Sequence, residues 1–130
     1  MLVVDASFVV QASATVDGLR RVTRQRPIAP PLLWSEVTSV LHELRWRRAV
    51  SEQLADVALR NFRSARIGLR RPTRLYEHAW AIASQLGWAK TYDAEYVALA
   101  RLENCPLLTL DGRLARASSR LVEIIEPKDL

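Results

Sequence analysis

Two short apolar runs, each ending at an aspartate, constrain the fold of this chain more than any other feature. Leu2 to Val4 leads to Asp5 near the start, and Pro106 to Leu110 leads to Asp111 near the end. A third apolar run spans Arg120 to Ile125, and segments with helical periodicity separate the runs. Strands that alternate with helices predict an α/β domain with a largely parallel sheet and helices on both faces. In such a sheet the functional crevice lies beyond the carboxyl ends of the strands.

The length of 130 residues predicts one domain over 1–130 with a single core. Cys105 is the only cysteine, which excludes an internal disulfide and a multi-cysteine zinc site. No basic segment precedes the first apolar run, and no run approaches the roughly 18 apolar residues of a membrane span. We therefore expect a cytoplasmic protein with no membrane contact. No glycine-rich phosphate-binding motif is present, which argues against a nucleotide cofactor.

The helical segments carry end signals in the sequence. Ser51 and Thr73 precede apolar periodic stretches and are expected to be N-caps, and Gly87 follows such a stretch and is expected to end it. The segment from Ile67 to Leu69 lies between the stretches that follow Ser51 and Thr73, and it is a possible short strand.

Three tryptophans differ in their position relative to the apolar faces. Trp34 and Trp80 lie on or near such faces and are expected in the core, whereas Trp46 lies about 180° from its stripe and is expected to be exposed. An exposed Trp46 could contact a second copy of the chain or a protein partner.

Acidic residues occupy positions from which they could share one crevice. Asp5 and Asp111 follow apolar runs directly, so parallel neighbouring strands would bring both carboxylates to the same edge. Glu36 lies on the margin of an apolar helical arc, and Asp93 lies in the first turn of a helix that Thr91 begins. Each position also has a purely structural interpretation: a helix cap or turn for the first two, a salt bridge to Arg47 or a surface position for Glu36, and a favourable helix N-terminus for Asp93.

Four carboxylates close together repel one another unless a cation or shared protons neutralise them. A hard divalent ion is the natural solution, because Mg²⁺ and Mn²⁺ prefer oxygen ligands and retain several waters. Such ions activate a water nucleophile and neutralise charge at a phosphodiester. The acids therefore predict a magnesium or manganese site.

Basic residues exceed acidic ones by nineteen to fourteen, and seventeen of the nineteen are arginine. The segment from Val57 to Tyr76 contains no acid but holds Arg60, Arg63, Arg66, Arg70, Arg71 and Arg74. Arginine matches phosphate through two parallel hydrogen bonds, so this segment indicates a polyanionic partner. Solvated helix charges or an acidic protein partner would give the same pattern.

Four segments together resemble a known family. They are Val3-Val4-Asp5-Ala6-Ser7, Pro31-Leu32-Leu33-Trp34-Ser35-Glu36-Val37, Tyr92-Asp93-Ala94-Glu95-Tyr96-Val97-Ala98-Leu99-Ala100 and Leu108-Thr109-Leu110-Asp111-Gly112-Arg113-Leu114. In order and spacing they resemble the PIN domain, specifically the VapC toxins, over essentially the whole chain.

The resemblance implies a metal-dependent endoribonuclease of a type II toxin–antitoxin pair, usually dimeric and inhibited by a VapB-like antitoxin. It implies that Asp5, Glu36, Asp93 and Asp111 bind the metal, with Ser7 and Thr109 supporting them through hydroxyl hydrogen bonds. Glu95 is an additional acid in the third segment. Two helical steps turn it about 200° from Asp93, so we expect it to face solvent.

Three hypotheses follow from the sequence. The first is a Mg²⁺- or Mn²⁺-dependent ribonuclease in which the acids bind metal, while Arg113 and the acid-free arginine segment hold the RNA backbone. The second is a non-catalytic basic domain that binds nucleic acid or an acidic partner. The third is a phosphohydrolase with Asp5 as nucleophile, which is disfavoured because Ser7 stands where such enzymes usually carry a second aspartate.

Overall fold

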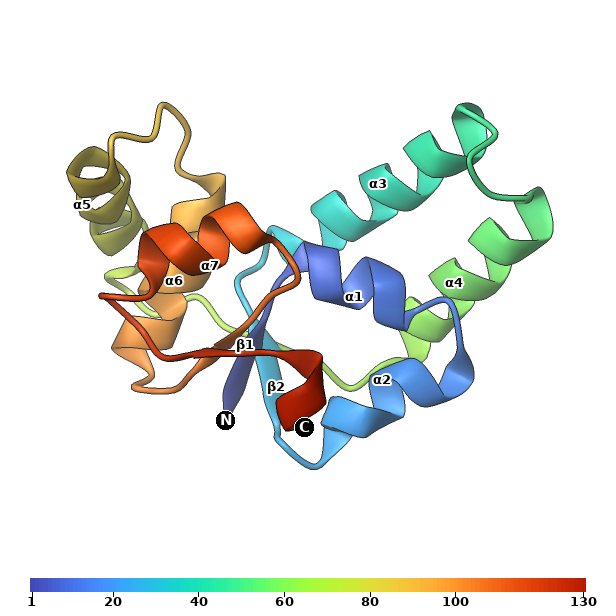
Figure 1. The fold of residues 1–130 in the computed structure, drawn as a ribbon, viewed down its shortest axis with the longest axis horizontal. Coiled ribbons are helices and arrows are strands. Elements are labelled where there is room, and N and C mark those ends of the chain that lie inside the picture. Colours follow the sequence, from blue (N-terminus) through green and yellow to red (C-terminus); the bar gives the residue numbers. More distant parts are fainter.

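The computed structural model describes residues 1–130, which form a five-stranded sheet in the order β3-β2-β1-β4-β5 (Figure 1). The strands are β1 (Leu2–Val4), β2 (Pro27–Ala29), β3 (Gly68–Leu69), β4 (Leu107–Leu108) and β5 (Ile124–Ile125). Every neighbouring pair is parallel. The predicted α/β fold with a parallel sheet is confirmed, and β3 is the short strand expected within Ile67 to Leu69.

Seven α-helices connect the strands, and a short 3-10 helix follows β5. They are α1 (Ala6–Ala12), α2 (Val16–Thr23), α3 (Leu33–Trp46), α4 (Glu52–Ser64), α5 (Leu75–Leu86), α6 (Tyr92–Leu102), α7 (Gly112–Ser118) and η1 (Pro127–Asp129). Helices α5 and α6 lie on one side of β1, and α1 to α4 lie on the other, with α3 and α4 forming an extended hairpin (Figure 1). None of the helices has the length and apolar character that a bilayer crossing requires.

The ends of the helices follow the sequence signals in part. The Ser51 hydroxyl accepts a 3.1 Å hydrogen bond from the Leu54 amide and caps α4 as predicted. Gly87 ends α5 in the left-handed conformation, with φ of 72°. The prediction that Thr73 caps α5 is wrong, because Arg74 occupies the N-cap position and no side chain caps this helix.

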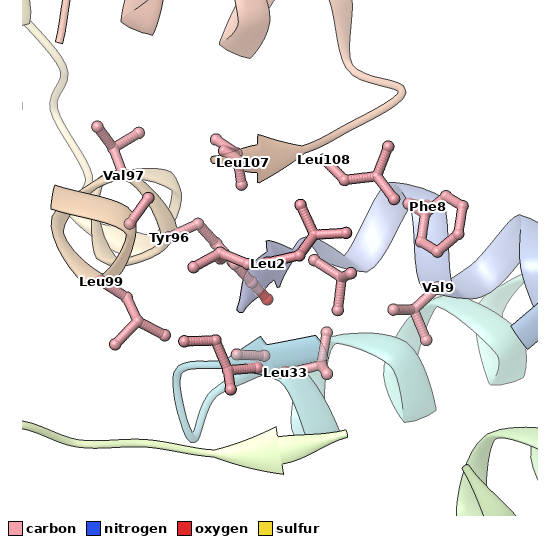
Figure 2. Packing of buried hydrophobic residues seen from close by; sticks show 14 of the residues in the cluster. Leu2, Phe8, Val9, Leu33, Tyr96, Val97, Leu99, Leu107 and Leu108 are labelled. Atoms are coloured by element: carbon pink, nitrogen blue, oxygen red, sulfur yellow. The ribbon is translucent and has the colours of Figure 1, made fainter. Parts of the chain in front are cut away.

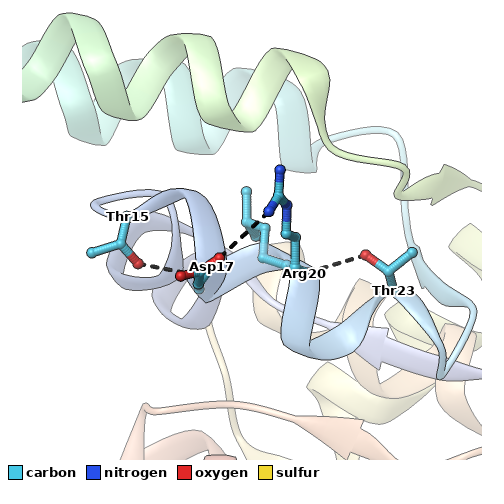
Figure 3. A network of polar contacts seen from close by, with 6 residues as sticks. Thr15, Asp17, Arg20 and Thr23 are labelled. Atoms are coloured by element: carbon cyan, nitrogen blue, oxygen red, sulfur yellow. Dashed lines mark hydrogen bonds and ion pairs between the residues drawn. The ribbon is translucent and has the colours of Figure 1, made fainter.

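Helix α2 packs closely against the end of α1. The Thr15 hydroxyl accepts a 3.1 Å hydrogen bond from the Gly18 amide, and Arg20 lies 3.6 Å from Asp17 (Figure 3). A Cβ atom at Gly18 would lie 2.1 Å from the Ala12 carbonyl oxygen, so only glycine fits at this crossing. This tight turn brings the chain back to start β2 beside β1.

The hydrophobic core is one cluster of 28 buried residues around β1 (Figure 2). All three residues of β1 are buried, and α6 is buried on every side from Ala94 to Ala100. Helix α6 is therefore held firmly between the sheet and α5, and its first turn is fixed relative to the strand ends.

Two of the three expectations for tryptophan are corrected. Trp46 is 80% exposed as predicted, but Trp80 is 73% exposed and lies outside the core. Trp34 is 38% exposed while its ring packs against Phe62 at a centroid distance of 4.6 Å. The core takes only Leu33, Val37 and Leu41 from α3, so the buried stripe of this hairpin helix is narrower than its apolar arc.

The order of the strands fixes where a site can form. From β1 the chain first adds β2 and β3 on one side and later adds β4 and β5 on the other, so the topological switch lies between β1 and β4. Asp5 follows β1 directly, and Thr109 and Asp111 follow β4. These residues stand at the carboxyl ends of adjacent parallel strands, where ligands bind in folds of this class.

Candidate active site

Asp5 is a buried carboxylate, with 4% of the residue exposed, and it lies at the centre of the site. Its Oδ1 atom accepts hydrogen bonds from the Ser7 hydroxyl at 2.7 Å and from the Phe8 amide at 3.0 Å. Its Oδ2 atom accepts one from the Thr109 hydroxyl. All of these donors are neutral, so the negative charge of Asp5 has no cationic partner within the protein.

The two hydroxyls connect β1 to the loop after β4. Thr109 accepts a 3.0 Å hydrogen bond from the Asp111 amide, and Ser7 accepts a 3.1 Å hydrogen bond from the Leu110 amide. Both hydroxyls therefore orient the Asp5 carboxylate and shape the loop that carries Asp111. Their contact with Asp5 is the arrangement that the family resemblance implied for Ser7 and Thr109.

Glu36 lies in the first turn of α3 and reaches the same end of the sheet. Its Oε1 atom accepts a hydrogen bond from the hydroxyl of Tyr96, whose ring is buried beneath the site. No ion pair joins Glu36 to Arg47, which instead lies 3.9 Å from Glu43. Glu36 therefore points inward to the acidic group and not outward to the basic surface of its helix.

Asp93 and Asp111 line one open cleft together with Glu36. The cleft has a volume of about 570 Å³. Its walls are Glu36, Gly87, Trp88, Ala89, Lys90, Tyr92, Asp93, Asp111, Arg113, Leu114 and Ala117. Asp111 also caps α7, because its Oδ1 accepts hydrogen bonds from the Arg113 and Leu114 amides at 2.9 and 3.3 Å. One oxygen of this carboxylate is thus used structurally, and the other is free to bind.

The four acids influence one another electrostatically, and the pKa values of three of them are raised. Burial is the main factor that raises the pKa of Asp5, and repulsion from Asp111 adds to it against the opposing hydrogen bonds. Burial likewise raises the pKa of Glu36, with further repulsion from Asp93 and Asp5. The Asp93 residue is exposed, but partial desolvation of its carboxyl and repulsion from Asp111 still raise its pKa, while Arg113 opposes the shift.

The donor set suits a hard divalent cation. None of the five ion pairs in the structure involves Asp5, Glu36, Asp93 or Asp111. No three acidic, histidine or cysteine side chains are as close as the ligands of one fully protein-bound ion. Because Mg²⁺ retains several waters and uses one or two carboxylates, the arrangement fits an ion that binds partly through water.

The expectation that Glu95 faces solvent is wrong. Glu95 is only 6% exposed, and burial followed by repulsion from Glu36 raises its pKa. The 200° rotation from Asp93 was correct geometry, but the face of α6 opposite Asp93 is covered by the rest of the protein, because every residue from Ala94 to Ala100 is buried. A fifth carboxylate therefore adds to the negative potential beside Glu36.

The structure brings together some of the expected basic residues and not others. Arg113 lines the cleft. The six arginines of the acid-free segment do not line it, and Arg70 lies 3.3 Å from Glu103 at the far end of α6. Binding of RNA by Arg60, Arg63, Arg66, Arg70, Arg71 and Arg74 stays a prediction.

Sequence reasoning missed Tyr96, Lys90 and Tyr92 as residues of the site. Tyr96 looked like an ordinary core aromatic on a helical stripe, although its hydroxyl needs a partner when buried. Tyr92 directly precedes Asp93 and Lys90 lies three residues before it, and this proximity is the one sequence signal that could have drawn attention to them.

Comparison with known proteins agrees with this geometry. The family model described as the PIN domain matches residues 2–119. VapC ribonuclease Mb0985 of Mycobacterium bovis is 36% identical over 117 residues, which cover 88% of this chain and 89% of that protein. Ribonuclease VapC1 of Mycobacterium tuberculosis is 37% identical over 129 residues, which cover 94% of each chain.

A solved structure supports the fold independently. The crystal structure of PAE2754 from Pyrobaculum aerophilum superposes with a TM-score of 0.73 at 22% sequence identity. The match covers 98% of this chain and 91% of that one. The arrangement of strands and helices is therefore shared with that protein over nearly the full length.

Proposed function

This chain belongs to the PIN-domain family and is homologous to the VapC ribonucleases, and on this premise we propose that it is a Mg²⁺- or Mn²⁺-dependent endoribonuclease, the toxin of a toxin–antitoxin pair. The main support is the environment of Asp5. Its carboxylate is buried, accepts hydrogen bonds only from neutral donors, and lies with three further acids at the switch point of the sheet. Such a charge is costly without a cation, so a cation site explains why it is kept there.

Asp5, Glu36, Asp93 and Asp111 would hold the ion. When bound, Mg²⁺ or Mn²⁺ supplies a nucleophile from coordinated water and neutralises the charge that develops on the phosphodiester. The choice of a hard ion rests on the all-oxygen donor set, because neither histidine nor cysteine lines the cleft.

The side chains of the chain itself perform three tasks in this proposal. Ser7 and Thr109 hold the two oxygens of Asp5 in fixed directions. Tyr96 fixes Glu36, which otherwise could turn towards solvent from the first turn of α3. Arg113, in the first turn of α7, places a cation beside Asp93 where a phosphate oxygen would lie.

Partners and location are also proposed. We propose an RNA substrate, a VapB-like antitoxin, a homodimer and a cytoplasmic location, with residues 1–130 as one PIN domain. Homology to VapC ribonucleases supports the first two. Exposed Trp46 and Trp80 support a protein interface, the single Cys105 is consistent with a reducing compartment, and one continuous core supports one domain.

The direct test is cleavage of a mixed pool of single-stranded RNA by the purified chain with Mg²⁺ or Mn²⁺ and with EDTA. We expect cleavage with the metal, none with EDTA, and none by Asp5→Asn in either condition. Asparagine is preferable to alanine because Asp5 also caps α1 through the Phe8 amide, and asparagine retains that cap. Tight RNA binding without any cleavage would favour the non-catalytic binding domain instead.

A further inference from the structure

One wall of the cleft is built by the loop between α5 and α6. Gly87 adopts a left-handed conformation at the end of α5, and the Trp88 amide returns to the Ala83 carbonyl at 2.8 Å. This reversal places Trp88, Ala89 and Lys90 along the cleft before α6 begins at Tyr92. The wall therefore ends at Tyr92, the residue before Asp93. Because both residues belong to α6, this helix fixes the position of the wall relative to Asp93.

This wall and α7 supply two cations without a carboxylate partner. Lys90 and Arg113 both line the cleft and are both exposed. Neither takes part in any of the five ion pairs of the structure. Glu36, Asp93 and Asp111 line the same cleft, so acids and cations that form no ion pair lie close together there.

The wall also supplies an aromatic surface. Tyr92 lines the cleft and is 57% exposed, although an aromatic ring of this size gains free energy from burial. Trp88 lines the same wall and is half-buried. Exposed aromatic rings beside unpaired cations are the features with which proteins bind single-stranded nucleic acids, through base stacking and phosphate contacts.

We propose that Lys90, Tyr92 and Arg113 form a subsite for the nucleotide next to the scissile phosphate of a single-stranded RNA. The base stacks on the ring of Tyr92, and the adjoining phosphate contacts Lys90 and Arg113. This inference rests on the proposed function, in which the neighbouring acids hold the reacting phosphate through a cation. A cleft of about 570 Å³ is large enough for a ligand the size of one nucleotide.

Single-stranded RNA fits this cleft better than a protein segment does. An acidic peptide that reached Lys90 and Arg113 would also bring its charge beside Asp93 and Asp111, where it would be repelled. A basic peptide would be attracted by the acids and repelled by the two cations. A nucleotide next to a cation-bound phosphate places negative charge at the basic wall and presents a neutral base to Tyr92.

The test compares Tyr92→Leu, Tyr92→Phe and Lys90→Gln with two matched controls outside the cleft. Tyr76→Leu removes a comparably exposed tyrosine of α5, and Lys128→Gln removes the only other lysine. The first readout is the Kd of a fluorescent pentaribonucleotide in EDTA, where no cleavage occurs. The second is KM, kcat and the distribution of cleavage sites in an RNA pool with Mn²⁺.

We expect Tyr92→Leu to raise Kd and KM about 5- to 100-fold with kcat nearly unchanged, because a stacked base is lost. Its cleavage sites should also redistribute, whereas Tyr92→Phe and both controls should match the wild type. Lys90→Gln should raise Kd and weaken its salt dependence.

If the wild type cleaves RNA but Tyr92→Leu and Lys90→Gln behave like the controls, or lower kcat alone, the subsite is refuted while the proposed function stands. A wild type that cleaves nothing refutes the function, and the Kd values in EDTA still decide the subsite. Loss of binding to a protein partner with unchanged RNA binding would also refute the subsite.

Discussion

The hydroxyl of Tyr96 donates a hydrogen bond to Oε1 of Glu36, which ties a carboxylate of α3 to the buried helix α6. Burial and the charge of Glu36 raise the pKa of Tyr96 far above its ordinary value, so this hydroxyl always carries its proton. Tyr96 is therefore a permanent donor and a positioning residue for Glu36.

Tyr96→Phe should weaken Mn²⁺ binding about 10- to 100-fold, because Tyr96 orients Glu36, a carboxylate that we propose binds the metal, without itself touching the metal. Calorimetric titration measures this effect. In a Glu36→Gln background the same substitution should have little further effect, since the group that it positions is already changed. Equal losses in both backgrounds would contradict this role and indicate a general effect on the core.

Thr109→Val should destabilise the protein by about 1 to 3 kcal/mol, because the Asp111 amide and one oxygen of Asp5 lose their partner. Chemical denaturation measures the free energy of unfolding. Thr23→Val is the matched control, since the Thr23 hydroxyl donates only to the Leu19 carbonyl of its own helix. Equal losses in the free energy of unfolding at the two positions would show that the Thr109 hydroxyl does not stabilise the site.

The metal-free protein should lose stability as the pH rises from about 4 towards neutrality. The folded-state pKa values of Asp5, Glu36 and Asp93 are raised above their ordinary values of 3.8, 4.5 and 3.8. Between the ordinary and the raised values, the folded state binds more protons than the unfolded state, so stability falls with rising pH in that window. Thermal melting in EDTA measures it, and Asp5→Asn should flatten the profile. A wild-type stability that rises steadily through the same window would contradict the clustering of charge.

Binding of RNA should weaken as salt is increased. Each phosphate contact made with single-stranded RNA contributes about 0.7 to the slope of log K against log salt. If the acid-free segment binds RNA, replacing Arg60, Arg63 and Arg66 together by glutamine should reduce the slope by about 2. An unchanged slope would assign those arginines to another surface and leave Lys90 and Arg113, which line the cleft, as the basic contacts.

The sequence was sufficient for the fold and for the arrangement of the acids at the strand ends. Apolar runs that end at Asp5 and Asp111 predict adjacent parallel strands, and β1 and β4 are paired in this way. Hydrogen bonds that depend on one tertiary contact, such as Tyr96 to Glu36, leave no periodic signal along the chain.

The expectations that failed concern exposure. Helical angles place Glu95 away from Asp93, but they do not reveal that α6 is buried on every side from Ala94 to Ala100. The apolar arcs likewise do not reveal that Trp34, near the start of α3, packs against Phe62 and still keeps 38% of its surface exposed. Periodicity gives the direction of a side chain, and tertiary packing decides what covers it.

Calorimetric titration of Mn²⁺ into the wild type and Asp5→Asn measures whether Asp5 binds a divalent cation. We predict a specific site in the wild type and a loss of affinity of at least tenfold in Asp5→Asn, because Asp5 is the ligand that we propose at the centre of the site. Asparagine keeps the cap of α1, so both proteins should remain folded. Absence of a specific site in the wild type, or equal affinity in the two proteins, would contradict the account and reduce the four acids to structural caps and surface charges.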